Sequence, residues 1–235
     1  LLRTLVDEGK NDLFIVGDAH QRIYGHKVVL GQCEINVRGR SKKLKLNYRT
    51  TDEIRKWAVA LFNGENIDDL DEGTDSNRDY KSLYNGPKPE VKNFETFDEE
   101  VTYIHQYIEN IKKTDNESKI CLVVRTQKLV DVYSDYFSKS NMKTIKISRN
   151  SKDDLSNTDV RIATMHRVKG LDFDHVIIAS MNKGIVPLET IEKSDEDLIN
   201  SENLQKEKSL VFVAATRAKK SLLVTSYGIT SEILR

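Results

Sequence analysis

The fold of this chain is decided by the stretch VRIATMHRVKGLDFDHVIIA, residues 160–179. Two short runs of β-branched and aliphatic residues, 160–164 and 175–179, predict central strands of a sheet that is covered on both faces. Polar residues after the first run would lie at the carboxyl end of a strand, where open α/β sheets bind ligands, although an ordinary solvated connection remains the alternative. The polar turn between the two runs contains Thr164, His166, Arg167, Lys169 and Asp172.

The composition is typical of a soluble globular protein. The chain has 235 residues, with 31% charged and 38% hydrophobic, and this length predicts one or two domains. Because the net charge is +0, any anionic partner must be held by local clusters of charge. The 2 cysteines, Cys33 and Cys121, lack metal-type spacing and indicate a reducing compartment, the cytoplasm. No signal peptide is visible and no apolar run approaches the roughly 20 residues that span a bilayer, so we expect no membrane partner.

Strands that alternate with helices predict a doubly wound α/β domain with a mainly parallel sheet. A helix is expected after Thr50, which forms a capping box with Glu53. Other helices are expected at 98–113, at 129–138 and in a segment that runs to about residue 219. The acidic stretch 65–79 has no calcium-loop pattern, and we predict no metal site. The expected strands are 13–17, 91–94, 120–124, 142–147, 160–164, 175–179 and 221–226.

Three further segments place polar planar groups or arginines at the ends of apolar elements. They are VGDAHQRIYG at 16–25, LNYRT at 46–50 and VFVAATRAKK at 211–220. A guanidinium suits bidentate contact with phosphate. Arg217 follows an apolar run, and burying it costs free energy unless it meets an anion. For Arg49 and Arg217, both an external anion and an internal salt bridge remain open.

Taken together, the four segments resemble, in chain order, motifs III, IV, V and VI of the UvrD/Rep family of superfamily 1 DNA helicases. Residues 120–127 are similar to motif IVa of that family, and 184–187 to the loop after motif V. Several motifs in the right order, each at the expected strand end or helix, are far more specific than one motif. The resemblance implies a RecA-like domain 2A over 44–235. Residues 1–43 would be the end of a first RecA-like domain, 1A, which carries motif III.

On the nucleotide side, the resemblance implies a catalytic set of Gln21, Arg49 and Arg217. Gln21 would sense the γ-phosphate and the attacking water, and the two arginines would act as arginine fingers. We therefore expect these three side chains to face a common anion-sized hollow. In the family this site also contacts ATP through residues that match Tyr48, which would stack on adenine, Gly170, and Asp172, where the family usually has Glu.

On the DNA side, the resemblance implies stacking and backbone contacts with a single strand. The family commonly has Trp or Phe at the position of His26 and Arg at that of Lys27, so we expect altered stacking there. His166 could instead be a general base, but this family uses a carboxylate for that task. The implied DNA-binding residues are Tyr24, His26, Lys27, Arg125, Gln127, Thr164 and His166.

The resemblance therefore implies the C-terminal half of an ATP-dependent 3′-to-5′ DNA helicase, working with ATP, Mg²⁺ and single-stranded DNA. The sequence has no GxxxxGK[ST] phosphate loop and no acidic magnesium-binding pair before motif III. We expect both upstream of Leu1, in an N-terminal RecA-like domain of the same chain. This 235-residue chain alone would then neither hydrolyse ATP nor unwind DNA. The short distance from Ile147 to Val160 implies that a large 2B insertion is absent.

Two alternatives remain open. One is a helicase-like regulatory or nuclease-partner module that binds nucleotide without unwinding DNA. The other is a plain α/β interaction module whose basic and aromatic residues make only internal contacts.

Overall fold

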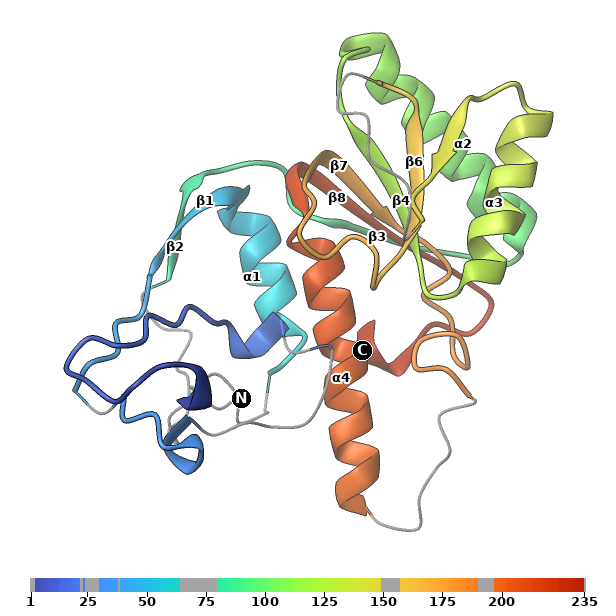
Figure 1. The fold of residues 1–235 in the computed structure, drawn as a ribbon. Coiled ribbons are helices and arrows are strands. Elements are labelled where there is room, and N and C mark those ends of the chain that lie inside the picture. The colour runs from blue at the N-terminus through green and yellow to red at the C-terminus, as the bar shows by residue number, and fades with distance from the viewer. Residues whose placement is uncertain are drawn as a thin grey trace.

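A computed structural model describes residues 3–21, 23, 30–37, 39–63, 80–148, 157–189 and 197–234. Its centre is a parallel sheet with the strand order β3-β8-β7-β4-β6-β5 and helices on both faces (Figure 1). The predicted doubly wound α/β fold is thereby confirmed. None of the helices in these ranges is long and apolar enough to cross a membrane. The strands are β3 (Glu90–Phe94), β4 (Ile120–Val124), β5 (Thr144–Lys146), β6 (Val160–Thr164), β7 (Phe173–Ile178) and β8 (Ala218–Tyr227).

Alternation along each buried strand builds two separate cores. In β4, Cys121 and Val123 face one core, while Ile120, Leu122 and Val124 face the other. The first core is covered by α1 (Asp52–Ala60) and α4 (Asp197–Ala215), and the second by α2 (Phe97–Thr114) and α3 (Gln127–Lys139). Because both faces are covered, β4 is continuously apolar, whereas β6 also carries the fully buried Arg161.

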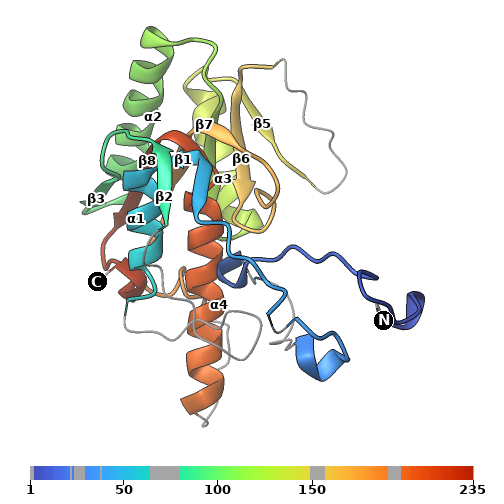
Figure 2. The ribbon, with the colours of Figure 1, turned by 90° about the vertical axis from the view of Figure 1, so that its left-hand side faces the viewer.

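A small parallel sheet of β1 (Leu46–Thr51) and β2 (Lys81–Tyr84) lies beside α1, near β8 (Figures 1 and 2). β2 was not predicted, because its residues are mostly exposed and show no apolar run. The predicted cap of α1 is wrong by one residue. The hydroxyl of Thr51, not Thr50, accepts the Ile54 N–H, and Glu53 accepts the Gly86 N–H at 2.8 Å instead of closing a capping box.

The strand predicted at 13–17 is wrong. Figure 2 shows this part of the chain extending away from the six-stranded sheet, and Phe14 is 94% exposed. A strand needs a hydrogen-bonded neighbour, and none of the described strands lies beside it. The described residues before β1 form only η1 (Arg3–Leu5), η2 (Ala19–Gln21) and η3 (Leu30–Cys33). The domain boundary at residues 43 and 44 stays a prediction.

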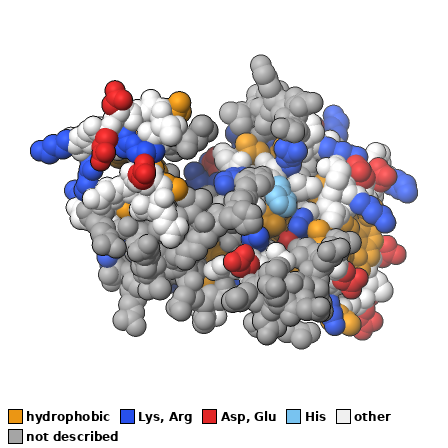
Figure 3. Space-filling model, turned by 60° about the horizontal axis from the view of Figure 1, so that its bottom comes forward, with side chains coloured by type: hydrophobic (Ala, Val, Ile, Leu, Met, Phe, Trp, Pro, Cys, Tyr) orange, Lys and Arg blue, Asp and Glu red, His pale blue; other side chains and the backbone are white. Residues whose placement is uncertain are grey.

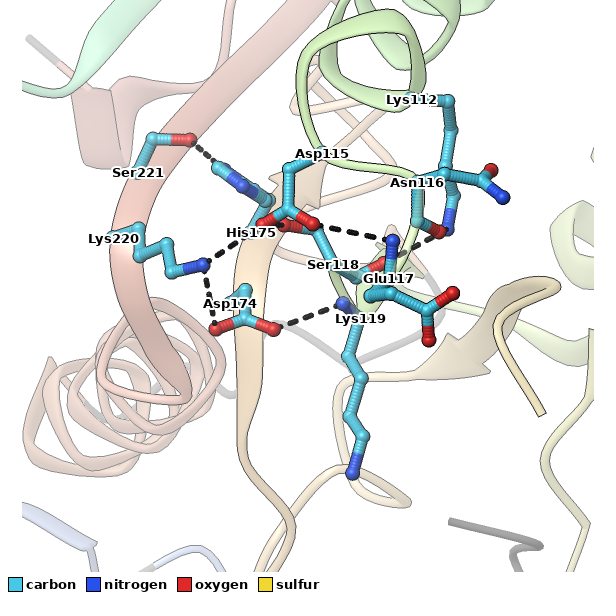
Figure 4. A network of polar contacts seen from close by, with 10 residues as sticks. All are labelled: Lys112, Asp115, Asn116, Glu117, Ser118, Lys119, Asp174, His175, Lys220 and Ser221. Carbon is cyan, nitrogen blue, oxygen red and sulfur yellow. Dashed lines mark hydrogen bonds and ion pairs between the residues drawn. The ribbon is translucent and has the colours of Figure 1, made fainter. Parts of the chain in front are cut away.

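A network of polar contacts joins the amino ends of the central strands (Figure 4). The Lys112 ammonium, at the end of α2, donates to the carbonyls of Asn116 and Ser118 at 2.8 Å and of Thr158 at 2.7 Å. These bonds connect α2 with the segments that enter β4 and β6. Lys220 also pairs with Asp115 and Asp174, and His175 bonds Ser221.

Candidate functional site

The candidate residues fall into two groups at opposite edges of the sheet. Arg125 and Thr164 lie at the carboxyl ends of β4 and β6, whereas Asp172 and Arg217 directly precede β7 and β8 at the amino edge. The sequence predicted the polar residues that follow 160–164, Asp172 among them, at the carboxyl edge. The difference arises because residues 165–172 cross the face covered by α4 from one edge to the other, with Met165 and Val168 packed in the same core as that helix.

Arg217 is the most unusual side chain of the amino-edge group. It is 2% exposed, and its Nε donates to the Val213 carbonyl at 3.1 Å. Its two Nη atoms make longer bonds to Leu171 O and Thr216 Oγ1. Among the described residues, no carboxylate forms an ion pair with it, so an internal salt bridge does not account for its position. A buried guanidinium without a carboxylate partner would be stabilised by an outside anion.

The charges around Arg217 bring several candidate residues into one neighbourhood. Burial and, next, the nearby Arg49 charge lower the pKa of Arg217 to about 10, while Asp172 and Asp18 oppose the shift. The Lys219 ammonium, which pairs with Asp172, holds the pKa of that carboxyl below its usual value. Arg49 is exposed and has no ion pair with any described carboxylate. Two arginines and Lys219 outnumber the two carboxylates, Asp172 and Asp18, so this place has excess positive charge.

Gln21 reaches the same neighbourhood through Asp18 and Lys169. Its Nε2 donates to Asp18 Oδ2 at 2.8 Å, and its carbonyl accepts from Lys169 Nζ at 3.1 Å. His20 anchors this segment because its ring stacks on Phe212 of α4 with a centroid distance of 5.3 Å. Segments far apart in the sequence therefore meet beside α4.

The remaining nucleotide candidates are open to solvent. Tyr48 lies on β1 and is 67% exposed, so its ring is available for stacking. Gly170 has a φ of +91°, and a Cβ there would meet no atom within 4 Å. Two cavities, of about 270 and 470 Å³, lie beside α2 and are lined by none of the candidate residues.

At the carboxyl edge, Arg125 is held by a carboxylate of α4. Its Nε donates to Glu207 Oε2 at 2.9 Å and its Nη2 to Glu207 Oε1 at 2.7 Å. Glu207 is 2% exposed. The Arg125 guanidinium is therefore fixed by a bidentate ion pair, while its Nη1 makes no hydrogen bond to a described residue.

His166 and Thr164 lie next to this pair, and Gln127 is exposed at the start of α3. Burial lowers the pKa of His166, Arg125 and Arg167 lower it further, and Glu207 opposes the shift. The ring is therefore neutral at pH 7 and can donate from one nitrogen only. Figure 3 views the molecule from below and shows Lys and Arg side chains around one histidine in the middle of that face.

Some predictions lie outside the described residues. They are the roles of Tyr24, His26 and Lys27 and the acidic stretch 65–79. Within the described ranges, no group of three or more His, Cys, Asp or Glu side chains could hold a metal ion.

Three residues of the site were missed by the sequence: Asp18, His20 and Glu207. Asp18 and His20 lie beside Gln21 in the segment 16–25, which resembles motif III. The sequence did not indicate which side chains these two residues contact. Glu207 lies between Lys206 and Lys208, a pattern typical of a solvated helix face. No signal in the sequence indicated that its carboxylate is buried.

Known proteins share this chain's sequence pattern. The family model of the UvrD-like helicase C-terminal domain matches residues 42–151 and 143–228. An ATP-dependent DNA helicase Rep of Buchnera aphidicola subsp. Schizaphis graminum is 39% identical over 66 residues, which are 28% of this chain and 9% of that protein. DNA helicase II of Rickettsia typhi is 38% identical over 66 residues, with the same two shares of 28% and 9%. A probable DNA helicase II homolog of Mycoplasma genitalium is 31% identical over 93 residues, 40% of this chain and 12% of that protein.

The matched parts span only about a tenth of the length of these curated relatives, from 9% to 12%. A solved structure has a similar fold: the C-terminal domain of a possible DNA helicase from Lactobacillus plantarum WCFS1. It superposes with a TM-score of 0.56 at 16% identity, over 80% of this chain and 92% of that one. The family match covers well over half of the chain, on a fold of the corresponding type. The chain belongs to the UvrD-like helicase C-terminal domain family.

Proposed function

We propose that this chain is part of an ATP-dependent DNA helicase or translocase that moves 3′ to 5′ along single-stranded DNA. Residues 44–235 would be its second RecA-like domain, and residues 1–43 the end of the first. The observation that carries the proposal is Arg217, a buried guanidinium beside Arg49 with no ion pair to a described carboxylate. An anion between the two arginines would compensate both charges.

The residues at the amino edge fit a nucleoside triphosphate. When bound, ATP with Mg²⁺ supplies the phosphoanhydride bond whose hydrolysis drives movement. Arg49 and Arg217 would neutralise the charge on the phosphates, and arginine fingers contribute on the order of 10³–10⁵ in rate. Gln21, oriented by Asp18, would donate its amide toward the attacking water. Tyr48 would stack on the base, and Gly170 lets the backbone approach the nucleotide.

No GxxxxGK[ST] phosphate loop occurs in these 235 residues, and the family's acidic magnesium-binding pair would lie upstream of Leu1. An N-terminal RecA-like domain would therefore supply the phosphate cradle and the magnesium ligands. Asp172 departs from the family's Glu and is already paired with Lys219. In this protein the ribose contact through Asp172 would require a rearrangement of that pair.

The carboxyl-edge group would hold the DNA strand. Arg125 and His166 supply donors for phosphate, and Thr164 and Gln127 supply neutral polar contacts. α4 extends 19 residues, about 28 Å, and its core face packs on the sheet between the two groups. Together with residues 165–172, this helix gives a physical connection between the DNA group and the nucleotide group.

The test replaces Arg217 by Lys in the full-length protein. We expect DNA-stimulated ATP hydrolysis to fall by about 10³-fold, because a lysine keeps the charge but loses the planar fork. Binding of single-stranded DNA should stay within about twofold, since Arg217 lies at the other edge of the sheet.

The matched control is Arg55→Lys on α1, where the guanidinium already pairs with Asp52 at 2.8 Å. This variant should hydrolyse ATP at the wild-type rate. Near-normal turnover by Arg217→Lys would refute the finger assignment. A wild-type protein that binds nucleotide but neither moves on DNA nor unwinds it would favour the regulatory alternative.

A further inference from the structure

Glu207 is a buried carboxylate whose partner comes from another motif. It lies on α4 with its side chain 3% exposed, and the Arg125 side chain that it binds is 12% exposed. The two hydrogen bonds, at 2.7 and 2.9 Å, engage both carboxylate oxygens. A carboxylate this deep is tolerated only when it is paired, so the contact is a permanent feature of the fold.

The pair uses only one edge of the guanidinium. Nε and Nη2 are committed to Glu207, and the two N–H groups of Nη1 have no acceptor among the described residues. Arg125 directly follows β4 at the carboxyl edge, where His166 follows β6. The proximity of Arg125, Glu207 and His166 is also seen in the pKa of His166, which responds to both charges.

We propose that Glu207 is a positioning residue for DNA binding: it fixes the Arg125 guanidinium and leaves its Nη1 donors for a backbone phosphate. This inference rests on the proposed function, since it assumes that Arg125 contacts single-stranded DNA. An arginine already held in one orientation loses little side-chain freedom when phosphate arrives. Because the Nε and Nη2 side of the Arg125 guanidinium is fixed, the DNA phosphate must approach from the Nη1 side.

The opposite relationship would be competition, in which phosphate displaces Glu207 from Arg125. Displacement would leave a buried carboxylate without compensation, which is strongly unfavourable. The pair should therefore persist in the DNA complex. The two relationships predict opposite signs for a variant that weakens the pair, because positioning loses affinity and competition gains it.

The experiment measures binding of a fluorescent oligothymidine of about 16 nucleotides to the 235-residue chain by anisotropy. Glu207→Gln keeps the size of the side chain but removes its charge, and we expect roughly three- to tenfold weaker binding. Arg125→Lys keeps the positive charge but loses the fork, and a similar loss is expected. The double variant should bind no more weakly than the weaker single variant, because both changes remove the same arrangement.

The matched control is Glu202→Gln, which removes the same charge from an exposed position of α4 and should leave the affinity unchanged. A second readout is the NMR titration of His166. Loss of the Glu207 charge should lower the pKa of His166, whereas Glu202→Gln should not move it. If Glu207→Gln does not fold by circular dichroism, Glu207→Asp replaces it, since a shorter carboxylate keeps the charge but cannot engage both donors equally.

Three outcomes would overturn the inference: unchanged or tighter binding by the Glu207 variant, additive losses in the double variant, or an unmoved His166 titration in Glu207→Gln. If Arg125→Lys binds weakly while the Glu207 variant binds normally, only the positioning role fails. If the wild-type chain shows no saturable binding at low salt, the proposed DNA contact itself fails.

Discussion

At the scale of single residues, two arginines with little exposed side chain, Arg125 and Arg217, carry opposite implications for stability. Arg125 has a carboxylate partner, whereas Arg217 has none among the described residues and makes bonds of 3.1 to 3.4 Å to neutral oxygens. Arg217→Met should therefore change the free energy of unfolding by less than about 1 kcal/mol, because the lost hydrogen bonds are offset by removal of a desolvated charge. Urea denaturation measures this.

The comparison is Arg125→Met, which leaves the buried Glu207 carboxylate without a partner. This variant should lower the free energy of unfolding by about 3–5 kcal/mol. Equal losses for the two methionine variants would show that Arg217 is held as firmly as Arg125, and would remove the argument for an outside anion. Under the proposed function, a phosphate group would compensate the charge of the Arg217 guanidinium, which bonds only neutral oxygens among the described residues.

At the scale of elements, one ammonium group, that of Lys112, joins several segments at the amino edge of the sheet. Lys112 connects the end of α2 with two segments that enter strands, through three carbonyl oxygens (Figure 4). Lys112→Met should lower the free energy of unfolding by about 2–4 kcal/mol, because three carbonyls lose a charged donor. The control is Lys113→Met, whose side chain is exposed and should change stability by less than about 0.5 kcal/mol. Thermal or urea denaturation measures both variants. Equal losses in the free energy of unfolding would contradict the role assigned to Lys112.

The elements also show which parts of the fold are readable from the sequence. The bounds of β4 and β6 match the prediction, because strands covered on both faces are rich in apolar residues, even though β6 includes the buried Arg161. β8 begins at Ala218, three residues before the predicted start, since exposed Lys219 and Lys220 conceal its amino end. The strand predicted at 13–17 fails for the opposite reason. Its apolar pattern is present, but among the described strands it has no neighbour with which to pair.

The candidate site was readable only in part, and for a physical reason. Arginines after apolar runs are visible in a sequence, so Arg49 and Arg217 could be selected and are near each other. Tertiary packing decides which acidic side chain pairs with which basic one. The pairing of Arg125 with Glu207 joins residues 82 positions apart, and nothing local to either residue specifies it.

At the scale of the whole molecule, the two groups of the site should be separable in their activities. In the proposed function, the carboxyl-edge group would bind DNA and the amino-edge group would supply arginine fingers, but the 235 residues contain no GxxxxGK[ST] phosphate loop. We expect the 235-residue chain to bind oligothymidine but to show no ATP turnover above background, with or without DNA. With about two phosphate contacts, the affinity for DNA should fall roughly five- to tenfold between about 50 and about 200 mM salt.

The turnover measurement uses release of inorganic phosphate, and Arg217→Lys controls for contaminating activity. A contaminant would give equal rates with both proteins, and would leave the prediction intact. DNA-stimulated turnover by the wild-type chain that Arg217→Lys abolishes would contradict it, because these residues would then hold and cleave ATP without the expected second domain. DNA binding and ATP turnover should be lost independently, because the two groups lie at opposite edges of the sheet. The helix α4 connects these edges without bringing the two groups together.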